Sequence, residues 1–234
     1  MTWKMYDALY DACERIDSEA EVRVLILKAT GGQAFVSGTD IAEFTAFHSR
    51  EDGVGYEQRL DRIIDRIDRV TKPTIAQVEG VAAGGGCLMA LACDLRVCTP
   101  QARFGVPIAR TLGNCLSAAS MARLVDLIGP ARAKDLLITG RLIDATEAAA
   151  LGLVTRMAEA KDIDQAVKDL AATISGHAPL TIRATKEIVR RIQMDRRPAA
   201  SEAEDLIALC YGSADFKEGV AAFLGKRQPR FSGV

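Results

Sequence analysis

Residues 72–94 read KPTIAQVEGVAAGGGCLMALACD, and this stretch decides the fold class of the chain. Its proline ends a preceding helix, and residues 74–79 are typical of a strand that ends at the next glycine. A glycine triplet, residues 84–86, opens the apolar segment 87–93, which is too short for its periodicity alone to assign. Residues 95–98 then form a second predicted strand. This order of strand, loop, short helix and strand predicts an α/β arrangement.

The chain before this stretch continues the alternation. Residues 7–15 predict a helix and residues 22–29 a mostly buried strand, which turns into Ala34-Phe-Val-Ser-Gly-Thr-Asp40. A helix beginning at Tyr56 has leucine, isoleucine and valine at helical spacing on one face. Its other face is predicted to be solvated and to hold paired charges, namely Asp61, Arg62, Asp65, Arg66, Asp68 and Arg69.

The chain after Leu116 is predicted to be helical. Residues 118–128 form one helix, Pro130 suits the first turn of the next, and Asp144 with Glu147 is typical of a capping box. Four further helical patterns follow, over residues 163–174, 180–192, 202–211 and 216–224.

Composition excludes several classes of function. The chain has 234 residues, enough for one substantial core, with 49% hydrophobic and 26% charged residues. Its formal net charge of -1 gives no bulk attraction to nucleic acid or to an anionic membrane. No stretch approaches the roughly 18 apolar residues of a membrane helix, and the first residues do not resemble a secretion signal.

Cysteine and histidine usage argues against a metal site. The six cysteines contain no CxxC pair, and His48 and His177 are the two histidines. Most of the cysteines lie in apolar runs, where we expect small buried hydrophobic side chains. Reduced thiols of this kind fit a cytoplasmic protein.

Two glycine-bearing turns are the candidate functional site. The first is residues 35–40, after a predicted strand, and the second is the glycine triplet at a predicted helix start. Glycine lets a ligand approach the backbone, and free N–H groups at a helix N-terminus favour negative charge. Two such groups aimed at one oxygen would form an oxyanion hole. Close packing of the helix against the sheet explains a glycine triplet equally well.

Taken together, these segments resemble the enoyl-CoA hydratase/isomerase (crotonase) family over nearly the whole chain. Each motif alone is weak, but their order and spacing are specific. The motifs are Ala34-Phe-Val-Ser-Gly-Thr-Asp-Ile41, Lys72-Pro-Thr-Ile-Ala-Gln-Val-Glu-Gly80, Ala83-Gly-Gly-Gly-Cys87, Cys93-Asp94, Arg103-Phe-Gly-Val-Pro107, Leu137-Ile-Thr-Gly140, Glu147-Ala148, Gly152-Leu-Val154 and Asp215-Phe-Lys-Glu-Gly-Val-Ala-Ala-Phe-Leu-Gly-Lys-Arg227.

The resemblance implies a spiral of ββα units and a CoA thioester substrate of the kind used in fatty acid metabolism. Residues 1–160 would form the acyl-CoA-binding core, and residues 161–234 a helical region for oligomerisation and CoA contacts. It also implies a homo-trimer or a hexamer of two trimers, with coenzyme A bound as part of the substrate. We expect no tightly bound cofactor, metal, nucleic acid or membrane partner.

The same resemblance assigns roles to particular residues. The backbone N–H groups of Ser37 and Gly85 would hold the thioester oxygen as an enolate forms. Ile41 and the backbone around Asp40 match positions that line the adenine pocket. The full set expected to bind substrate or CoA is Gly38, Asp40, Ile41, Gly84, Gly86, Leu88, Ile108, Phe223 and Lys226. Phe223 and Lys226 match C-terminal residues that often reach CoA from a neighbouring subunit, although Lys226 is equally typical of a basic tail.

Two positions depart from the family pattern. Hydratases of the family use two glutamates, one after the glycine triplet and one after the Phe-Gly-x-Pro turn. Leu88 and Ile108 stand at these positions. Hydration by paired glutamates and a simple double-bond isomerisation are therefore disfavoured, because both need an acid–base group.

Three nearby residues are candidates for the missing chemistry. Arg110 follows the lost second glutamate and could bind a carboxylate on the acyl group, or point to solvent. Glu57 and Tyr56 begin a helix from which catalytic groups are recruited in the family, although each taken alone is expected at the surface. Family chains also carry further strands before the first helix, so we expect the native or ancestral chain to begin upstream of Met1.

Two functions fit these observations. The first is an enzyme that stabilises an enolate of a CoA thioester with a non-standard acid–base set, by hydration, dehydration, isomerisation or decarboxylation. The second is a catalytically inactive acyl-CoA-binding protein or oligomer subunit. The acyl chain, the reaction subtype and the acid–base group are not determined by the sequence.

Overall fold

Two four-stranded sheets organise the chain in the computed structural model, which describes residues 1–196 and 199–233. The first sheet is parallel throughout and has the order β1 (Leu25–Lys28), β3 (Thr74–Val78), β5 (Leu95–Cys98) and β8 (Arg156–Met157). The second has the order β2 (Ala34–Val36), β4 (Val81–Ala83), β6 (Arg103–Gly105) and β7 (Ile143–Asp144), with β7 antiparallel to β6.

Strands β1 to β6 alternate between the two sheets, so each of the first three turns of the chain adds one strand to each sheet and then a helix; β7 then joins the same sheet as β6, and β8 joins the other. β1 and β2 are followed by the 3-10 helix η1 (Ile41–Ala46) and by α2 (Arg50–Asp68). β3 and β4 are followed by α3 (Gly85–Ala92), and β5 and β6 by α4 (Ile108–Thr111). The predicted spiral of ββα units is therefore confirmed.

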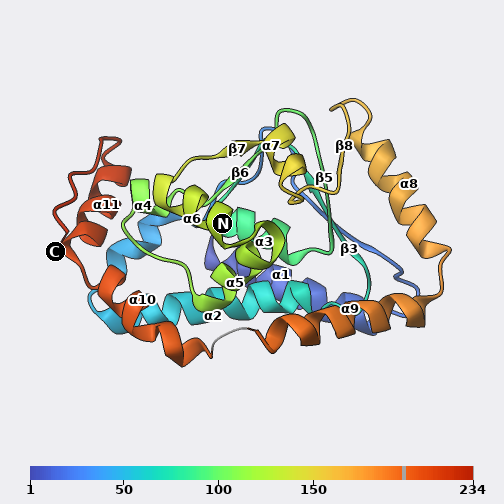
Figure 1. The fold of residues 1–234 in the computed structure, drawn as a ribbon, viewed down its shortest axis with the longest axis horizontal. Coiled ribbons are helices and arrows are strands. Elements are labelled where there is room, and N and C mark those ends of the chain that lie inside the picture. Colours follow the sequence, from blue (N-terminus) through green and yellow to red (C-terminus); the bar gives the residue numbers. More distant parts are fainter. Residues whose placement is uncertain (197–198, 234) are drawn as a thin grey trace.

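The remaining helices cover the sheets and extend from both ends of the molecule. They are α1 (Trp3–Ser18), α5 (Ala118–Ile128), α6 (Pro130–Thr139), α7 (Ala145–Ala150), α8 (Ile163–Ser175), α9 (Pro179–Met194), η2 (Ala200–Ala203), α10 (Glu204–Tyr211) and α11 (Ala214–Leu224). Figure 1 shows α8 and α9 at one end and α10 and α11 at the other. α10 packs against α2 and α11 against η1, so the end of the chain returns to the first turn of the spiral.

The predicted helices and strands are present, and some of them begin or end a few residues away from the predicted bounds because of capping residues. The helix expected from Tyr56 begins at Arg50, because Ser49 and Asp52 form a capping box: each side chain accepts a hydrogen bond from the other residue's amide. The apolar segment 87–93 is helical except for its last residue. Asp144 accepts from the Glu147 amide at 2.8 Å and so begins α7 as predicted.

The prediction of a solvated charged face on α2 is wrong for part of that face. Arg66 is 9% exposed, and its guanidinium donates to the Cys13 carbonyl at 2.9 Å and pairs with Asp17. Asp65 on the same face pairs with Arg123 of α5. The cause is that α1 packs against α2 and that Arg123 of α5 reaches Asp65, which helical periodicity alone does not reveal.

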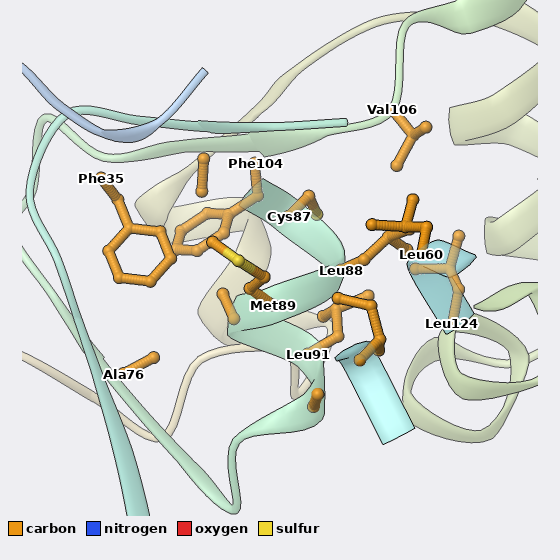
Figure 2. Close-up of a cluster of buried hydrophobic side chains, with 14 of the residues drawn as sticks. Phe35, Leu60, Ala76, Cys87, Leu88, Met89, Leu91, Phe104, Val106 and Leu124 are labelled. Carbon is orange, nitrogen blue, oxygen red and sulfur yellow. The ribbon is translucent and has the colours of Figure 1, made fainter. Parts of the chain in front are cut away.

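The core is built around α3, every residue of which is buried. Figure 2 shows Met89 pointing toward Phe35 and Phe104 on one side of the helix. On the opposite side Leu88 lies beside Leu60 of α2 and Leu124 of α5. A helix that is apolar all round cannot lie at a surface, so α3 passes through the middle of the molecule.

Most of the cysteine side chains are buried, as the sequence predicts. Cys13, Cys87, Cys93 and Cys98 are buried, while Cys115 and Cys210 are half-buried, and all six are free. Among the described residues, no helix is both long enough and apolar enough to cross a membrane.

Candidate functional site

The turn after β2 packs directly against the N-terminus of α3. A Cβ at Gly86 would stand 2.0 Å from the carbonyl oxygen of Val36, so a side chain at this position is excluded. Gly84 has φ +54° and ψ −127°, a conformation that favours glycine, and a Cβ there would lie 3.7 Å from Cα of Gly38. Close packing therefore explains part of the triplet, and it places the backbone of Ser37 beside the helix.

The start of α3 offers free hydrogen-bond donors at this contact. Gly85 and Gly86 are the first two residues of the helix, so their amides have no acceptor within it. The aligned peptide dipoles add a partial positive charge at the same end. An anionic oxygen placed between the two glycine turns would meet these donors.

A chain of three hydroxyl groups lies beside Gly85. The Tyr6 and Thr39 hydroxyls are 3.0 Å apart, and those of Thr39 and Tyr56 are 2.8 Å apart. The Tyr6 hydroxyl is so near that a Cβ at Gly85 would lie 2.5 Å from it. Burial raises the pKa of both Tyr6 and Tyr56, so these phenols stay neutral and can both donate and accept.

Aromatic rings surround this hydroxyl chain. They come from α1, η1, the residue that follows η1, α2, α10 and α11, and we call them the aromatic cluster: Trp3, Tyr6, Phe44, Phe47, Tyr56, Tyr211 and Phe216. Phe44 meets Tyr56 edge-on with ring centroids 4.8 Å apart, and Tyr211 lies 4.7 Å from Phe216. The cluster makes the side of the site next to α2 apolar, which strengthens electrostatic interactions there.

Glu57 is a buried carboxylate next to the aromatic cluster. It is 2% exposed, and its two oxygens accept hydrogen bonds from different segments. The Tyr211 hydroxyl of α10 donates to Oε1 at 2.5 Å, and the Ser117 amide at the start of α5 donates to Oε2 at 3.0 Å. The Asn114 side-chain amide in turn donates to the Tyr211 hydroxyl at 2.9 Å.

The surroundings of Glu57 favour its protonated form. Burial raises its pKa to about 8, and the negative charge of Asp61 acts in the same direction. The hydrogen bonds from Tyr211 and Ser117 act in the opposite direction. Asp61, one helical turn away, accepts from the Ser117 hydroxyl at 2.6 Å. A carboxyl group with this pKa can exchange a proton near neutral pH.

The expectation that Tyr56 and Glu57 lie at the surface is therefore wrong. Tyr56 is 8% exposed and Glu57 is 2% exposed. The reason is visible in the helical spacing, because Glu57 precedes Leu60 by three residues and Ile64 by seven, on the apolar face of α2. Their neighbours on α1, η1 and α10 come from distant parts of the chain.

The other residues that the sequence predicts for the site lie in different environments. Leu88 is fully buried within the core, while Ile108 is half-buried as the first residue of α4. Arg110 is exposed on α4, and its Cβ lies against Gly140. Asp40 caps η1 by accepting from the Ala42 amide at 3.1 Å.

The remaining candidates lie at the start of η1 and at the end of α11. Ile41 is the half-buried first residue of η1. Phe223 is 51% exposed, and Lys226 is exposed with φ +50°. α11 packs against η1 within one chain, so the two segments that carry these residues are neighbours.

Three residues of the site were missed by sequence reasoning: Tyr6, Thr39 and Tyr211. Thr39 lies within a motif that the sequence did single out, two residues after Ser37. Tyr211 lies four residues after Ile207, on the same face of a helix whose residues after Asp205 are apolar, which is a weak signal of burial. Nothing in the local sequence indicates that Tyr6 reaches Gly85.

Comparison with known proteins agrees with this architecture. A family model described as enoyl-CoA hydratase/isomerase matches residues 1–234. The chain is 36% identical to a crotonyl-CoA hydratase of Syntrophomonas wolfei, over 94% of this chain and 85% of that protein. It is also 36% identical to a putative enoyl-CoA hydratase of Thermus thermophilus, over 96% of this chain and 88% of that protein.

Solved structures show the same fold. A methylmalonyl-CoA decarboxylase in complex with 2-nitronate-propionyl-CoA superimposes with a TM-score of 0.89, at 29% identity over 98% of this chain and 88% of that chain. An enoyl-CoA hydratase/isomerase from Pseudoalteromonas atlantica gives a TM-score of 0.85, at 32% identity over 99% and 90%. The spiral of ββα units is thus that of the crotonase fold. The chain belongs to the enoyl-CoA hydratase/isomerase family.

Proposed function

We propose that this protein is an enzyme that binds a CoA thioester and stabilises its enolate. The amides of Ser37 and Gly85 would donate to the thioester oxygen, on which the enolate places its negative charge. The observation that carries this proposal is the contact of the turn at Gly38 with the start of α3 at Gly84. Preorganised donors of this kind lower the barrier because they are already oriented before the charge develops.

Glu57 is the proposed acid–base group of the site. Its pKa of about 8 means that it is mostly protonated at pH 7 and can donate a proton to the α-carbon of an enolate. Its hydrogen bonds to Tyr211 and Ser117 fix the position of the carboxyl group. Tyr56 would contribute through the hydroxyl chain that it forms with Thr39.

Decarboxylation is the reaction that fits these groups best. Loss of CO₂ from a carboxyl group on the α-carbon leaves the bonding electron pair as an enolate, without a base and without an activated water. One proton donor then completes the reaction. The apolar residues at Leu88 and Ile108 suit this route, and the similarity to a methylmalonyl-CoA decarboxylase supports it. Arg110 would bind the acyl carboxylate, and substrate preference that stays unchanged in Arg110→Met would contradict that role.

A non-catalytic acyl-CoA-binding protein is the second candidate. The same apolar residues at 88 and 108 favour it, because hydratases of the family carry glutamates there. The two functions differ in turnover. A binding protein saturates with CoA esters and releases no product from malonyl-CoA, methylmalonyl-CoA or crotonyl-CoA.

The decisive experiment is an ultraviolet titration with acetoacetyl-CoA, whose enolate absorbs strongly when a working oxyanion hole binds it. Gly85→Ala and Gly85→Pro are the matched variants. Both add a Cβ against the Tyr6 hydroxyl, but only proline removes the N–H donor, and the first position of a helix tolerates proline. Each variant is combined with Tyr6→Phe to relieve the contact.

We expect the enolate band in the wild type and in Tyr6→Phe/Gly85→Ala, and its loss in Tyr6→Phe/Gly85→Pro. Circular dichroism confirms that the variants are folded. A folded wild type without the band would contradict the enzyme proposal. A band of equal strength in both double variants would contradict the assignment of Gly85.

Assembly and location are part of the same proposal. We propose a homo-trimer, or a hexamer of two trimers, in the cytoplasm. α9 has no buried residue, and large apolar side chains are exposed on α9 and α10: Leu180, Ile188, Val189, Ile192, Leu206 and Leu209. Sedimentation equilibrium tests the assembly, and a monomer at micromolar concentration would contradict it.

A further inference from the structure

Two cysteines that are distant in sequence meet beside the candidate site. Cys115 precedes α5 and Cys210 lies in the last turn of α10, and each thiol shifts the pKa of the other, as neighbouring groups do. The Cys115 thiol also lies 3.7 Å from the carbonyl oxygen of Leu206, one turn earlier on α10. Both residues are half-buried, whereas the other four cysteines are buried.

The adjacent residues hold the same two segments together. Asn114 donates to the Tyr211 hydroxyl at 2.9 Å, and Tyr211 donates to Glu57. Each cysteine is therefore next to a residue of this hydrogen-bonded chain. A disulfide requires its two Cα atoms within about 4.4–6.8 Å, and the hydrogen bond between Asn114 and Tyr211 holds the two segments side by side.

The two thiols differ in reactivity. The hydrogen bond from Cys115 lowers the pKa of Cys210 to about 7, because the thiolate accepts it more strongly than the thiol does. The same hydrogen bond and burial raise the pKa of Cys115. Cys210 is therefore the attacking thiolate near neutral pH, and Cys115 is the thiol that reacts second.

We propose that Cys115 and Cys210 form a reversible disulfide site that is oxidised by a low-molecular-weight disulfide such as oxidised glutathione. The Cys210 thiolate attacks one sulfur of that disulfide, forms a mixed disulfide and releases one glutathione thiolate. Cys115 then loses its proton to water and attacks Sγ of Cys210, which releases the second glutathione thiolate. The two cysteines lose two electrons, and these electrons reduce one oxidised glutathione to two thiols.

The disulfide would tie the segment before α5 to α10. These are the two segments that donate hydrogen bonds to Glu57, through Ser117 and Tyr211. Oxidation would therefore constrain the two segments that hold Glu57, although neither cysteine is itself a proposed catalytic or binding residue. The inference is independent of the proposed enzyme activity, because it concerns the thiols alone.

The test uses the full native chain, treated with oxidised glutathione at pH 7.5 and then alkylated in denaturant. Non-reducing peptide mapping by mass spectrometry identifies the products. We expect a linked pair of peptides that contains Cys115 and Cys210, with a mass lower by two hydrogen atoms. The other four cysteines should be alkylated. A mixture of ¹⁴N- and ¹⁵N-labelled chains distinguishes a link within one chain from a link between two.

Two variants test the order of attack. Cys115→Ser keeps a hydrogen-bond donor at that position and should accumulate glutathione on Cys210. Cys210→Ser should take up glutathione on Cys115 at least about tenfold more slowly. A link between chains, glutathione that stays on Cys210 in the wild type, or equal rates in the two variants would overturn the proposal. Since the first two readouts use the wild type, they do not depend on the folding of any variant.

Discussion

The Tyr211 hydroxyl donates to Oε1 of Glu57 at 2.5 Å, although the two residues are 154 positions apart. This hydrogen bond joins the end of the chain to α2, the helix that lies against the core helix α3. It also stabilises the ionised carboxylate that burial disfavours. Its neighbours Asn114 and Ser117 complete a set of hydrogen bonds around one buried acid.

We expect Glu57 to make stability fall as pH rises. Its folded pKa is about 8, against an ordinary value of 4.5, so the folded state binds the proton more tightly. The stabilisation is full below about pH 4.5 and is lost as pH rises through about 8, by an amount on the order of 4 kcal/mol. Urea unfolding between pH 5 and pH 9 measures it.

The variant Glu57→Gln should flatten this pH dependence, because an amide does not titrate there. Glu51→Gln removes an exposed carboxylate from the same helix and should leave the slope as it is in the wild type. An identical slope in Glu57→Gln and the wild type would exclude Glu57 as the titrating group.

Tyr211→Phe should destabilise the protein more at high pH than at low pH. The variant keeps the ring but removes the donor to Glu57, which matters most when the carboxylate is charged. We expect a loss of about 1 kcal/mol at pH 6 and about 2–3 kcal/mol at pH 9. Tyr10→Phe, whose ring lies against the Arg62 guanidinium, serves as the control and should change stability by less than about 0.5 kcal/mol. Equal losses at both pH values would contradict the charged hydrogen bond.

Two glycine substitutions should have opposite effects. Gly86→Ala would place a Cβ 2.0 Å from the Val36 carbonyl oxygen, so we expect a loss of about 3 kcal/mol or more. A Cβ at Gly55, in the interior of α2, would meet no atom within 4 Å, so Gly55→Ala should gain about 0.5–1 kcal/mol. Thermal unfolding measures both variants, and a neutral Gly86→Ala would show that β2 and α3 are not in tight contact.

Asp17 should contribute much more to stability than an exposed carboxylate does. It pairs with Arg66 and accepts from the Thr71 amide at 2.8 Å and hydroxyl at 2.7 Å. Burial opposes its ionisation, but these hydrogen bonds outweigh that effect and lower its pKa. Because Asp17→Asn leaves Arg66 half-paired in a buried position, we expect a loss of about 3 kcal/mol. Glu187→Gln, on the surface of α9, should cost less than about 1 kcal/mol in the same denaturant titration.

The sequence by itself determined the fold and the two turns of the candidate site. The glycine triplet at residues 84–86 predicts the second turn because only glycine fits where α3 meets the carbonyl of Val36. The strands and the longer helices around it follow from periodicity and from turn residues that act over a few positions, whereas the short apolar α3 follows from the glycine turn before it. Because such constraints act between residues that are close in the sequence, the sequence alone is sufficient to predict them.

Only the tertiary structure decided which polar groups the site contains. Glu57 is buried because α2, α5 and α10 close around it, and its proton affinity depends on that burial. The approach of Tyr6 to Gly85 and of Cys115 to Cys210 likewise depends on how distant helices pack. Periodicity shows which face of a helix is covered, but the identity of the covering residue is set by the path of the whole chain.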